Sequence, residues 1–263
     1  MNILEEIVAN KRIEVEEQKK IKPVSVLEKL PLFSTASFSI KRFLLEPNRS
    51  GIIAEFKRKS PSKGVINHHP NLTLITTAYA GNGAAGLSIL TDNKFFGGSI
   101  DDIISARFNA VPILRKDFII DEYQVIETKA IGADVILLIA AILTPKEIKE
   151  LTMVAHSLGL EVILEVHNEE ELDSIPERMD VIGINNRDLK TFEVNLDTSV
   201  RLSSLIPAEK LKISESGIHN IKDLIYLRQF GFNGFLIGEN FMKEEDPGLA
   251  FMKFVSELNN TLV

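Results

Sequence analysis

Cysteine is absent from the 263-residue sequence. Its absence excludes disulfide bonds, cysteine-ligated zinc sites and catalysis by a thiol nucleophile, and it fits a reducing compartment. Long apolar runs are absent as well, because no stretch approaches the ~20 residues that a membrane-spanning helix requires. The N-terminal sequence MNILEEIVANKR also lacks the apolar core of a signal peptide. We therefore expect a cytoplasmic protein without a membrane partner.

An excess of basic residues is also missing. The chain has 30 Lys and Arg against 37 Asp and Glu, and its net charge of −7 disfavours a general nucleic-acid binder. Hydrophobic residues make up 44% and charged residues 25% of the chain, as in ordinary globular proteins. The length is near the ~250 residues of a single (β/α)8 barrel, which is enough to form a core without a metal or disulfide.

Short runs rich in Val, Ile and Leu alternate with helix-like segments along the chain. The runs, which we interpret as strands, begin near Ile52, Leu87, Val111, Val135, Val162, Val181, Leu211 and Phe235. The segments expected to be helical include 71–82, 99–108, 121–131, 145–158, 197–205 and 218–230. The expected helix N-caps are Asp121, Thr144 and Asp197. Left-handed residues that end helices are expected at Gly132, Gly159 and Gly231.

This alternation predicts an α/β fold with a single (β/α)8 TIM barrel. Continuous apolar runs are typical of parallel strands that helices cover on the outside, and an open α/β sheet is the alternative. Ile3, Leu4, Ile7 and Val8 have helical spacing, so residues 1–45 are expected to form a helical extension. The barrel is expected to span residues 46–263, and the chain 1–263 to be one domain.

Charged and polar residues stand at the ends of several predicted strands, where packing alone does not favour them. Side chains alternate between the two faces of a strand, so one choice of parity directs all of these residues to the same mouth of a barrel. The residues that converge in this way are Glu55, Lys57, Lys116, Glu165, Asn185 and Glu215. A single such pair would indicate a structural ion pair, but the set predicts an acid–base site at the carboxyl ends of the strands.

Residues after the last two predicted strands suit a phosphate group. Ser216 and Gly217 follow the seventh strand and Gly238 follows the eighth, where barrels often bind phosphate through backbone N–H groups. Glu239 begins a short segment that we expect to be helical. Because its carboxylate would add an acceptor where donors are needed, we expect it only to cap that helix.

Other features of the loops also favour a small anionic ligand. The basic loop 57–64 contains Pro and Gly and is expected to be a mobile flap over the mouth. Phe96 and Phe118 follow the second and third strands and are expected to face an aromatic ligand, whereas Arg187 is suited to a carboxylate. The histidines, at positions 68, 69, 156, 167 and 219, show no metal-ligand spacing and are assigned structural or solvated positions.

With these features the chain resembles the indole-3-glycerol phosphate synthase family. The motifs that carry the resemblance are AEFKRKSPSKG (54–64), LTDNKFFGGS (90–99), ILRKDFIID (113–121), LEVH (164–167), GINNRDL (183–189) and SESGI (214–218). The resemblance implies a TIM barrel with an N-terminal helical extension. It also implies conversion of 1-(2-carboxyphenylamino)-1-deoxyribulose 5-phosphate to indole-3-glycerol phosphate in tryptophan biosynthesis, with no cofactor and no metal.

The resemblance also implies roles for the residues at the mouth. Lys116 is the expected general acid of ring closure and Glu165 the expected general base of dehydration. Glu55, Asn185 and Glu215 are expected to orient the substrate and these two groups, and Lys57 is expected to act as the second acid or as an anchor for an anionic group. The residues expected to contact substrate are Ser60, Phe96, Phe118, Leu138, Arg187, Ser216, Gly217, Gly238 and Glu239.

Three other functions are alternatives to this one. The neighbouring pathway enzyme phosphoribosylanthranilate isomerase works with a Cys and Asp pair, which a chain without cysteine does not have. A Schiff-base aldolase would also use a strand lysine such as Lys116. A barrel that binds a phosphorylated ligand without turnover is the alternative of a different class. The expected partner is a phosphorylated small molecule, and the expected state is a monomer or weak homo-oligomer.

Overall fold

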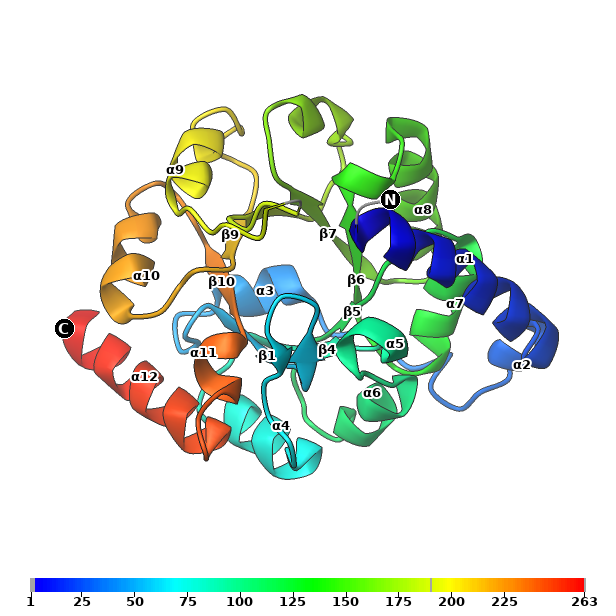
Figure 1. The fold of residues 1–263 in the computed structure, drawn as a ribbon, viewed down its shortest axis with the longest axis horizontal. Coiled ribbons are helices and arrows are strands. Elements are labelled where there is room, and N and C mark those ends of the chain that lie inside the picture. Colours follow the sequence, from blue (N-terminus) through cyan, green and yellow to red (C-terminus); the bar gives the residue numbers. More distant parts are fainter. Residues whose placement is uncertain (1–2, 190, 263) are drawn as a thin grey trace.

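Eight parallel strands close into a barrel in the computed structural model, which describes residues 3–189 and 191–262 (Figure 1). In chain order they are β1 Ile52–Phe56, β4 Gly86–Leu90, β5 Ile113–Lys116, β6 Val135–Ile139, β7 Glu161–Val166, β8 Val181–Asn185, β9 Lys212–Glu215 and β10 Gly234–Ile237. Each strand pairs with its chain neighbour, and β1 pairs with β10 to close the ring. The predicted closed barrel is confirmed and the open sheet is excluded.

Helices cover the outside of the barrel. They are α4 Leu72–Gly81, α6 Ile100–Ala106, α7 Glu122–Ala130, α8 Pro145–Ser157, α9 Asp197–Ser203, α10 Ile221–Arg228 and α12 Pro247–Leu262. The connection after β7 is shorter and contains only the 3-10 turn η2 Glu170–Ser174. Small elements at the mouth are α5 Asn93–Phe96, η1 Ala140–Ile142 and α11 Glu239–Met242. The short helix expected after Gly238 is therefore present.

The helix boundaries test the predicted caps. Thr144 forms a capping box with Glu147, and the Asp121 side chain accepts from Tyr123 N, as predicted. Asp197 is not a cap, because it is already the first residue of α9. Its backbone N–H instead donates to the side chain of Asn195, 2.9 Å away. The three glycines expected to end helices all have positive φ.

Two apolar layers hold the barrel together. Alternate strand residues such as Ile53, Leu137 and Ile163 fill the interior, while their neighbours pack outward against the helices. Helix α3 Ile40–Leu45 closes the amino end of the barrel, because Ile40 and Leu44 join the interior layer. The interior is thus a packed core, and a cavity that could hold a ligand opens at the carboxyl ends of the strands.

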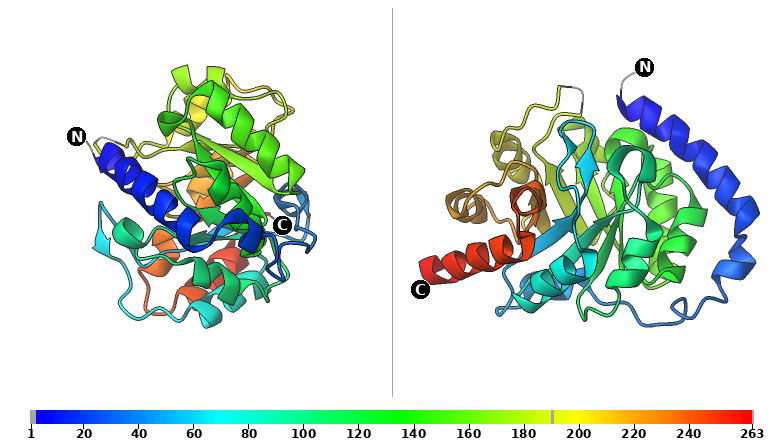
Figure 2. Two further views of the ribbon diagram at one scale, coloured as in Figure 1. Left: turned by 90° about the vertical axis from the view of Figure 1, so that its right-hand side faces the viewer. Right: turned by 60° about the horizontal axis from the view of Figure 1, so that its bottom comes forward.

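The predicted helical extension precedes the barrel and reaches its mouth. It begins with α1 Ile3–Ile21 and continues through α2 Val24–Leu27, and Figure 2 shows α1 running along the side of the barrel with its N-terminal end beside the mouth. The ammonium of Lys11 lies 3.0 Å from carboxylate oxygens of both Asp92 and Asp117. Burial would lower the pKa of Lys11, but the surrounding carboxylates outweigh burial and raise it. This buried ion cluster fastens α1 to the loops after β4 and β5.

Candidate active site

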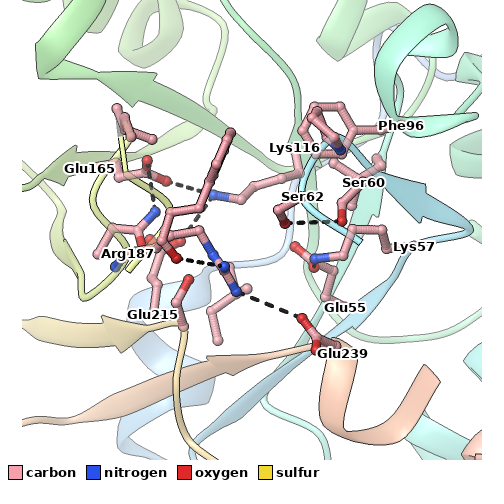
Figure 3. A pocket seen from close by; sticks show the side chains of 18 of the residues that line it. Glu55, Lys57, Ser60, Ser62, Phe96, Lys116, Glu165, Arg187, Glu215 and Glu239 are labelled. Carbon is pink, nitrogen blue, oxygen red and sulfur yellow. Dashed lines mark hydrogen bonds and ion pairs between the residues drawn. The ribbon is translucent and has the colours of Figure 1, made fainter. Parts of the chain in front are cut away.

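A cavity of about 500 Å³ opens at the carboxyl ends of the strands (Figure 3). Every residue of the predicted acid–base set lines it, and five of the six lie on the strands. Strand β1 contributes Glu55, with Lys57 directly after it, and the other members are Lys116, Glu165, Asn185 and Glu215. The cause is the common parity of the strands, since the five strand residues each stand two residues beyond an interior core position or a glycine, and Lys57 stands two beyond Glu55.

Lys116 is the centre of a buried ion network. Its Nζ donates to Glu165 Oε2 at 2.7 Å and to Glu215 Oε2 at 2.9 Å. Asn185 Nδ2 donates to the other oxygen of Glu165, at 3.1 Å. These contacts join β5, β7, β8 and β9 at one depth of the barrel, which holds an ammonium between two carboxylates in a site largely screened from water.

Burial and neighbouring charges shift the proton affinities of this network. Burial would lower the pKa of Lys116, but Glu165 and Glu215 outweigh it and raise that pKa. Burial would likewise raise the pKa of Glu165, but Lys116 and His167 lower it. Burial raises the pKa of Glu215 to about 7, with the Lys116 charge opposing and the Glu165 charge adding to the rise. Near neutral pH the site therefore holds a protonated amine, an ionised carboxylate and a carboxyl close to its midpoint.

Glu55 and Lys57 form a second ion pair on the opposite wall. Lys57 Nζ donates to Glu55 Oε1 at 2.5 Å. Gly238 lies directly against Glu55, because a Cβ added at this glycine would stand 2.8 Å from the Cβ of Glu55. The absence of a side chain at residue 238 is therefore needed for the position of Glu55.

The predicted phosphate region is present at the ends of β9 and β10. Ser216 and Gly217 both have positive φ, 67° and 80°, and Ser216 is one of only two described non-glycine residues in that conformation. Such a strained backbone at a site edge is typical of a ligand-binding turn. Glu239 is the first residue of α11, and its carboxylate lies 3.7 Å from both Arg187 and Lys63. Two cations thus lie beside the carboxylate of Glu239 at this end of the cavity.

An apolar wall faces the ion network across the cavity. The rings of Phe96 and Phe118 lie with their centroids 6.0 Å apart, and both line the cavity as predicted. The prediction of Leu138 is wrong, because the side chain of Leu138 packs outward among the helix-facing residues. Its neighbours Leu137 and Ile139 line the cavity instead. The error is one residue of strand parity, which moves a side chain to the other face.

The loop after β1 folds over the cavity as a small hairpin. Its strands are β2 Lys59–Ser60 and β3 Gly64–Val65, and Ser60, Pro61, Ser62 and Lys63 line the cavity. The basic residues of this loop separate into two groups. Arg58 pairs with Asp102 and Lys59 donates to a carbonyl of α5, so both act on the structure of the loop. Lys57 and Lys63 instead line the cavity, where each lies beside a carboxylate, that of Glu55 and of Glu239 respectively.

The sequence interpretation missed several residues of the site. Ile3, Leu4 and Ile7 of α1 line the cavity, so the extension is part of its wall. His167, assigned to a structural position, has its Nε2 only 3.2 Å from Glu165 Oε1. The signal was available, since residues 165 and 167 share a strand face. Within the described residues, no group of three or more His, Asp or Glu side chains is arranged to hold a metal ion. Nor does any described helix have the length and apolarity to cross a membrane.

Comparison with known proteins places this geometry in a family. Residues 4–254 match the family model of indole-3-glycerol phosphate synthase. A protein of that name from Bacteroides thetaiotaomicron is 50% identical over 98% of this chain and 99% of its own length. Another, from Salinibacter ruber, is 42% identical over 98% of this chain and 96% of its own length.

A solved structure shows the same fold at low sequence identity. Tryptophan synthase subunit alpha from Legionella pneumophila superposes with a TM-score of 0.62 over 85% of this chain and 97% of that chain, at 16% identity. That likeness concerns the barrel alone. The match over nearly the whole length, together with the 50% identity over 258 residues, decides the family. The chain belongs to the indole-3-glycerol phosphate synthase family.

Proposed function

We propose that this protein converts 1-(2-carboxyphenylamino)-1-deoxyribulose 5-phosphate to indole-3-glycerol phosphate, carbon dioxide and water. The proposal rests on one observation. Lys116 Nζ donates hydrogen bonds to both Glu165 and Glu215 at the mouth of a barrel that belongs to this family. The substrate offers an aromatic ring, a carboxylate and a phosphate. The cavity offers an apolar wall, cationic side chains and a turn of the phosphate-binding kind, which suit these three groups.

Lys116 is the proposed general acid of ring closure. The ring carbon that bears the carboxylate attacks the ketose carbonyl, and the carbonyl oxygen becomes a hydroxyl by taking the proton of Lys116. The carboxylate then leaves as carbon dioxide, and its bonding electrons restore the aromatic ring. A positioned acid contributes roughly 10²–10⁴ in rate. The raised pKa keeps Lys116 protonated, so the acid form is present before substrate arrives.

Glu165 is the proposed general base of dehydration. It removes a proton from the carbon between the nitrogen and the carbinol centre, and the hydroxyl leaves as water with a proton from Lys57, the proposed second acid. The lowered pKa of Glu165 keeps it ionised, as a base must be. Asn185, which donates to Glu165, fixes the direction of its carboxylate. Glu215, whose pKa lies near neutral pH, is suited to return protons to Lys116.

The remaining predicted residues are proposed to bind substrate. Ser216, Gly217 and Gly238 suit the phosphate through their backbone, and Arg187 suits an anionic group near them. Phe96 and Phe118 suit the aromatic ring, together with Leu137 in place of Leu138. Lys57 and Glu55 face the ribulose hydroxyls, and the hairpin with Ser60 closes the mouth. We propose no cofactor for this reaction, a cytoplasmic location, and a monomer or weak homo-oligomer.

The test of this function is indole fluorescence after wild-type protein is mixed with the proposed substrate and no added cofactor. An increase in fluorescence with release of carbon dioxide supports the proposal. Binding of a reduced, non-reactive substrate analogue without any turnover would instead favour the ligand-binding barrel. Borohydride treatment during turnover addresses the Schiff-base alternative, because a lysine acting as general acid leaves no covalent adduct.

A further inference from the structure

His167 lies between two carboxylates directly beside the proposed base. Its Nε2 is 3.2 Å from Glu165 Oε1, and its Nδ1 is 3.2 Å from Oε2 of Glu171 in η2. The backbone N–H of His167 also donates to Glu171, at 2.8 Å. The imidazole side chain is 10% exposed, so little water competes for these contacts. Each nitrogen of this buried imidazole thus lies 3.2 Å from a carboxylate oxygen. Nδ1 is hydrogen-bonded to Glu171, whereas Nε2 faces Glu165 as an ion-pair contact that lacks hydrogen-bond geometry.

This arrangement specifies the charge of the imidazole. A carboxylate oxygen is an acceptor, and a neutral imidazole carries a hydrogen on only one of its two nitrogens. With either neutral tautomer, one nitrogen lone pair of His167 would face a carboxylate oxygen. Only the imidazolium ion presents N–H groups in both directions. Burial would lower the pKa of His167, but Glu165 and Glu171 outweigh burial and raise it to about 9.

The neighbouring elements add charges of both signs. On one side, Glu165 Oε2 accepts from Lys116 at 2.7 Å (Figure 3). The other oxygen of the same carboxylate is the one that faces His167. On the other side, His167 lines a separate cavity between α1 and the loops after β6, β7 and β8. The charged side chains that share this second cavity are Glu5, Arg12, Glu171 and Asp188. His167 therefore joins the proposed acid–base pair to a carboxylate outside the substrate cavity.

We propose that protonated His167 is a positioning residue, which keeps Glu165 ionised and weakens the pull of that carboxylate on the proton of Lys116. The inference rests on the proposed function of these two residues. A cation 3.2 Å from Glu165 favours its ionised form. The same cation offsets part of the negative charge that binds the Lys116 proton, so Lys116 transfers its proton to substrate more readily. His167 does not line the substrate cavity, and its effect therefore passes through Glu165.

The first test is the pH dependence of kcat for the wild type and His167→Gln. At pH 7 we expect the variant to be slower by about tenfold, with little change in KM, since a nearby charge of this kind is worth about one pKa unit. Above the pKa of about 9, wild-type His167 loses its proton and the two kcat values converge. A role in packing alone would give a ratio that does not change with pH, and that result overturns the inference.

Two further variants sharpen the test. Glu171→Gln removes the outer carboxylate and so lowers the pKa of His167. We expect the kcat of this variant to fall below that of wild type at a lower pH than the one at which wild-type His167 loses its proton. In the His167→Gln background, Glu171→Gln should have no further effect on kcat. The matched control is His156→Gln, which removes another histidine paired with a carboxylate, Asp180, at 2.7 Å but far from the mouth. We expect this control to keep the wild-type kcat at every pH.

A measurement without turnover separates the inference from the proposed function. Nuclear magnetic resonance of histidine-labelled protein follows the imidazole of His167 directly, with His167→Gln assigning its signal. A midpoint well above the ~6.5 of an ordinary histidine supports the ion bridge, and a midpoint near 6.5 overturns it. If wild-type protein shows this raised midpoint but no indole formation, the proposed function fails and the bridge itself stands.

Discussion

The Nζ of Lys116 lies 2.7 Å from Oε2 of Glu165, so the proposed acid and the proposed base are hydrogen-bonded to each other. Each group stabilises the charged form of the other, which gives both the protonation state that their roles require. The same contact has a kinetic consequence. Substrate must replace part of the ion pair before Lys116 can reach a carbonyl oxygen, and the second carboxylate, Glu215, keeps the ammonium in place meanwhile.

The close packing of Gly183 against Glu215 predicts that a side chain at residue 183 lowers kcat. A Cβ at Gly183 would overlap Glu215 Oε1 and stand 3.2 Å from Ile163, so Gly183→Ala forces the carboxylate away from Lys116. We expect a fall in kcat of about 10²-fold with a folded protein, as displacement of a catalytic group by an ångström can cost that much. Steady-state fluorescence assays measure it. Gly81→Ala, where a Cβ meets no atom within 4 Å, is the control and should match wild type.

The buried charge of Lys11 predicts a large loss in the free energy of unfolding when this residue, which ties α1 to the barrel, is replaced. Lys11→Ala leaves Asp92 and Asp117 without their shared cation, and breaking a buried pair of this kind costs about 3–5 kcal/mol. Urea unfolding of the two proteins gives the difference. Lys19→Ala serves as the control, because Lys19 on the same helix is 34% exposed and should cost about 1 kcal/mol or less. Equal losses for the two variants would show that the buried cluster does not fasten α1.

The strands were predictable because their cause is local. Runs rich in Val, Ile and Leu that end in charged residues led to each strand within two residues of its observed start. The largest shift is at β5, which begins at Ile113 rather than Val111 because Pro112 has no N–H for the ladder. Parity within each strand then placed Glu165 and Glu215 together, since alternation is a property of the backbone.

Features that depend on contacts between distant segments were not predictable. The pairing of Lys11 with Asp92 depends on where α1 docks, which no local pattern records. The face of Leu138 depends on a one-residue register that its uniformly apolar strand does not reveal.

His167, by contrast, was predictable from the sequence. It was set aside because its spacing suited no metal, although its parity with Glu165 carried the relevant information.

Glu239 predicts an effect on substrate affinity. Its carboxylate stands at the start of α11, beside the proposed phosphate turn, and is 3.7 Å from Arg187. Glu239→Gln removes a negative charge that repels phosphate, so KM should fall by about fivefold, equivalent to ~1 kcal/mol for a pair near the surface. Glu244→Gln, an exposed change on the following turn, is the control. An unchanged or higher KM in Glu239→Gln would place the phosphate elsewhere.

The pKa of His167 predicts how stability depends on pH. The folded-state pKa of about 9 exceeds the ordinary 6.5, so the folded protein binds more protons between these values than the unfolded chain does. The stabilisation from this group is therefore complete below pH 6.5 and is lost as the pH rises through 9, by at most about 3 kcal/mol. Urea unfolding at a series of pH values should show this decline in wild type and a smaller one in His167→Gln. Parallel declines would contradict the ion bridge.

The central claim is that Lys116 delivers the proton that drives ring closure. The most direct measurement is kcat of Lys116→Met by indole fluorescence at saturating substrate, compared with wild type and with Lys212→Met. Lys212 is also buried, 4% exposed, but it stands at the amino end of β9, away from the cavity. The account predicts a loss of at least ~100-fold for Lys116→Met, as for a missing general acid, and a far smaller loss for the control. A Lys116→Met protein that retains most of the wild-type kcat would contradict it.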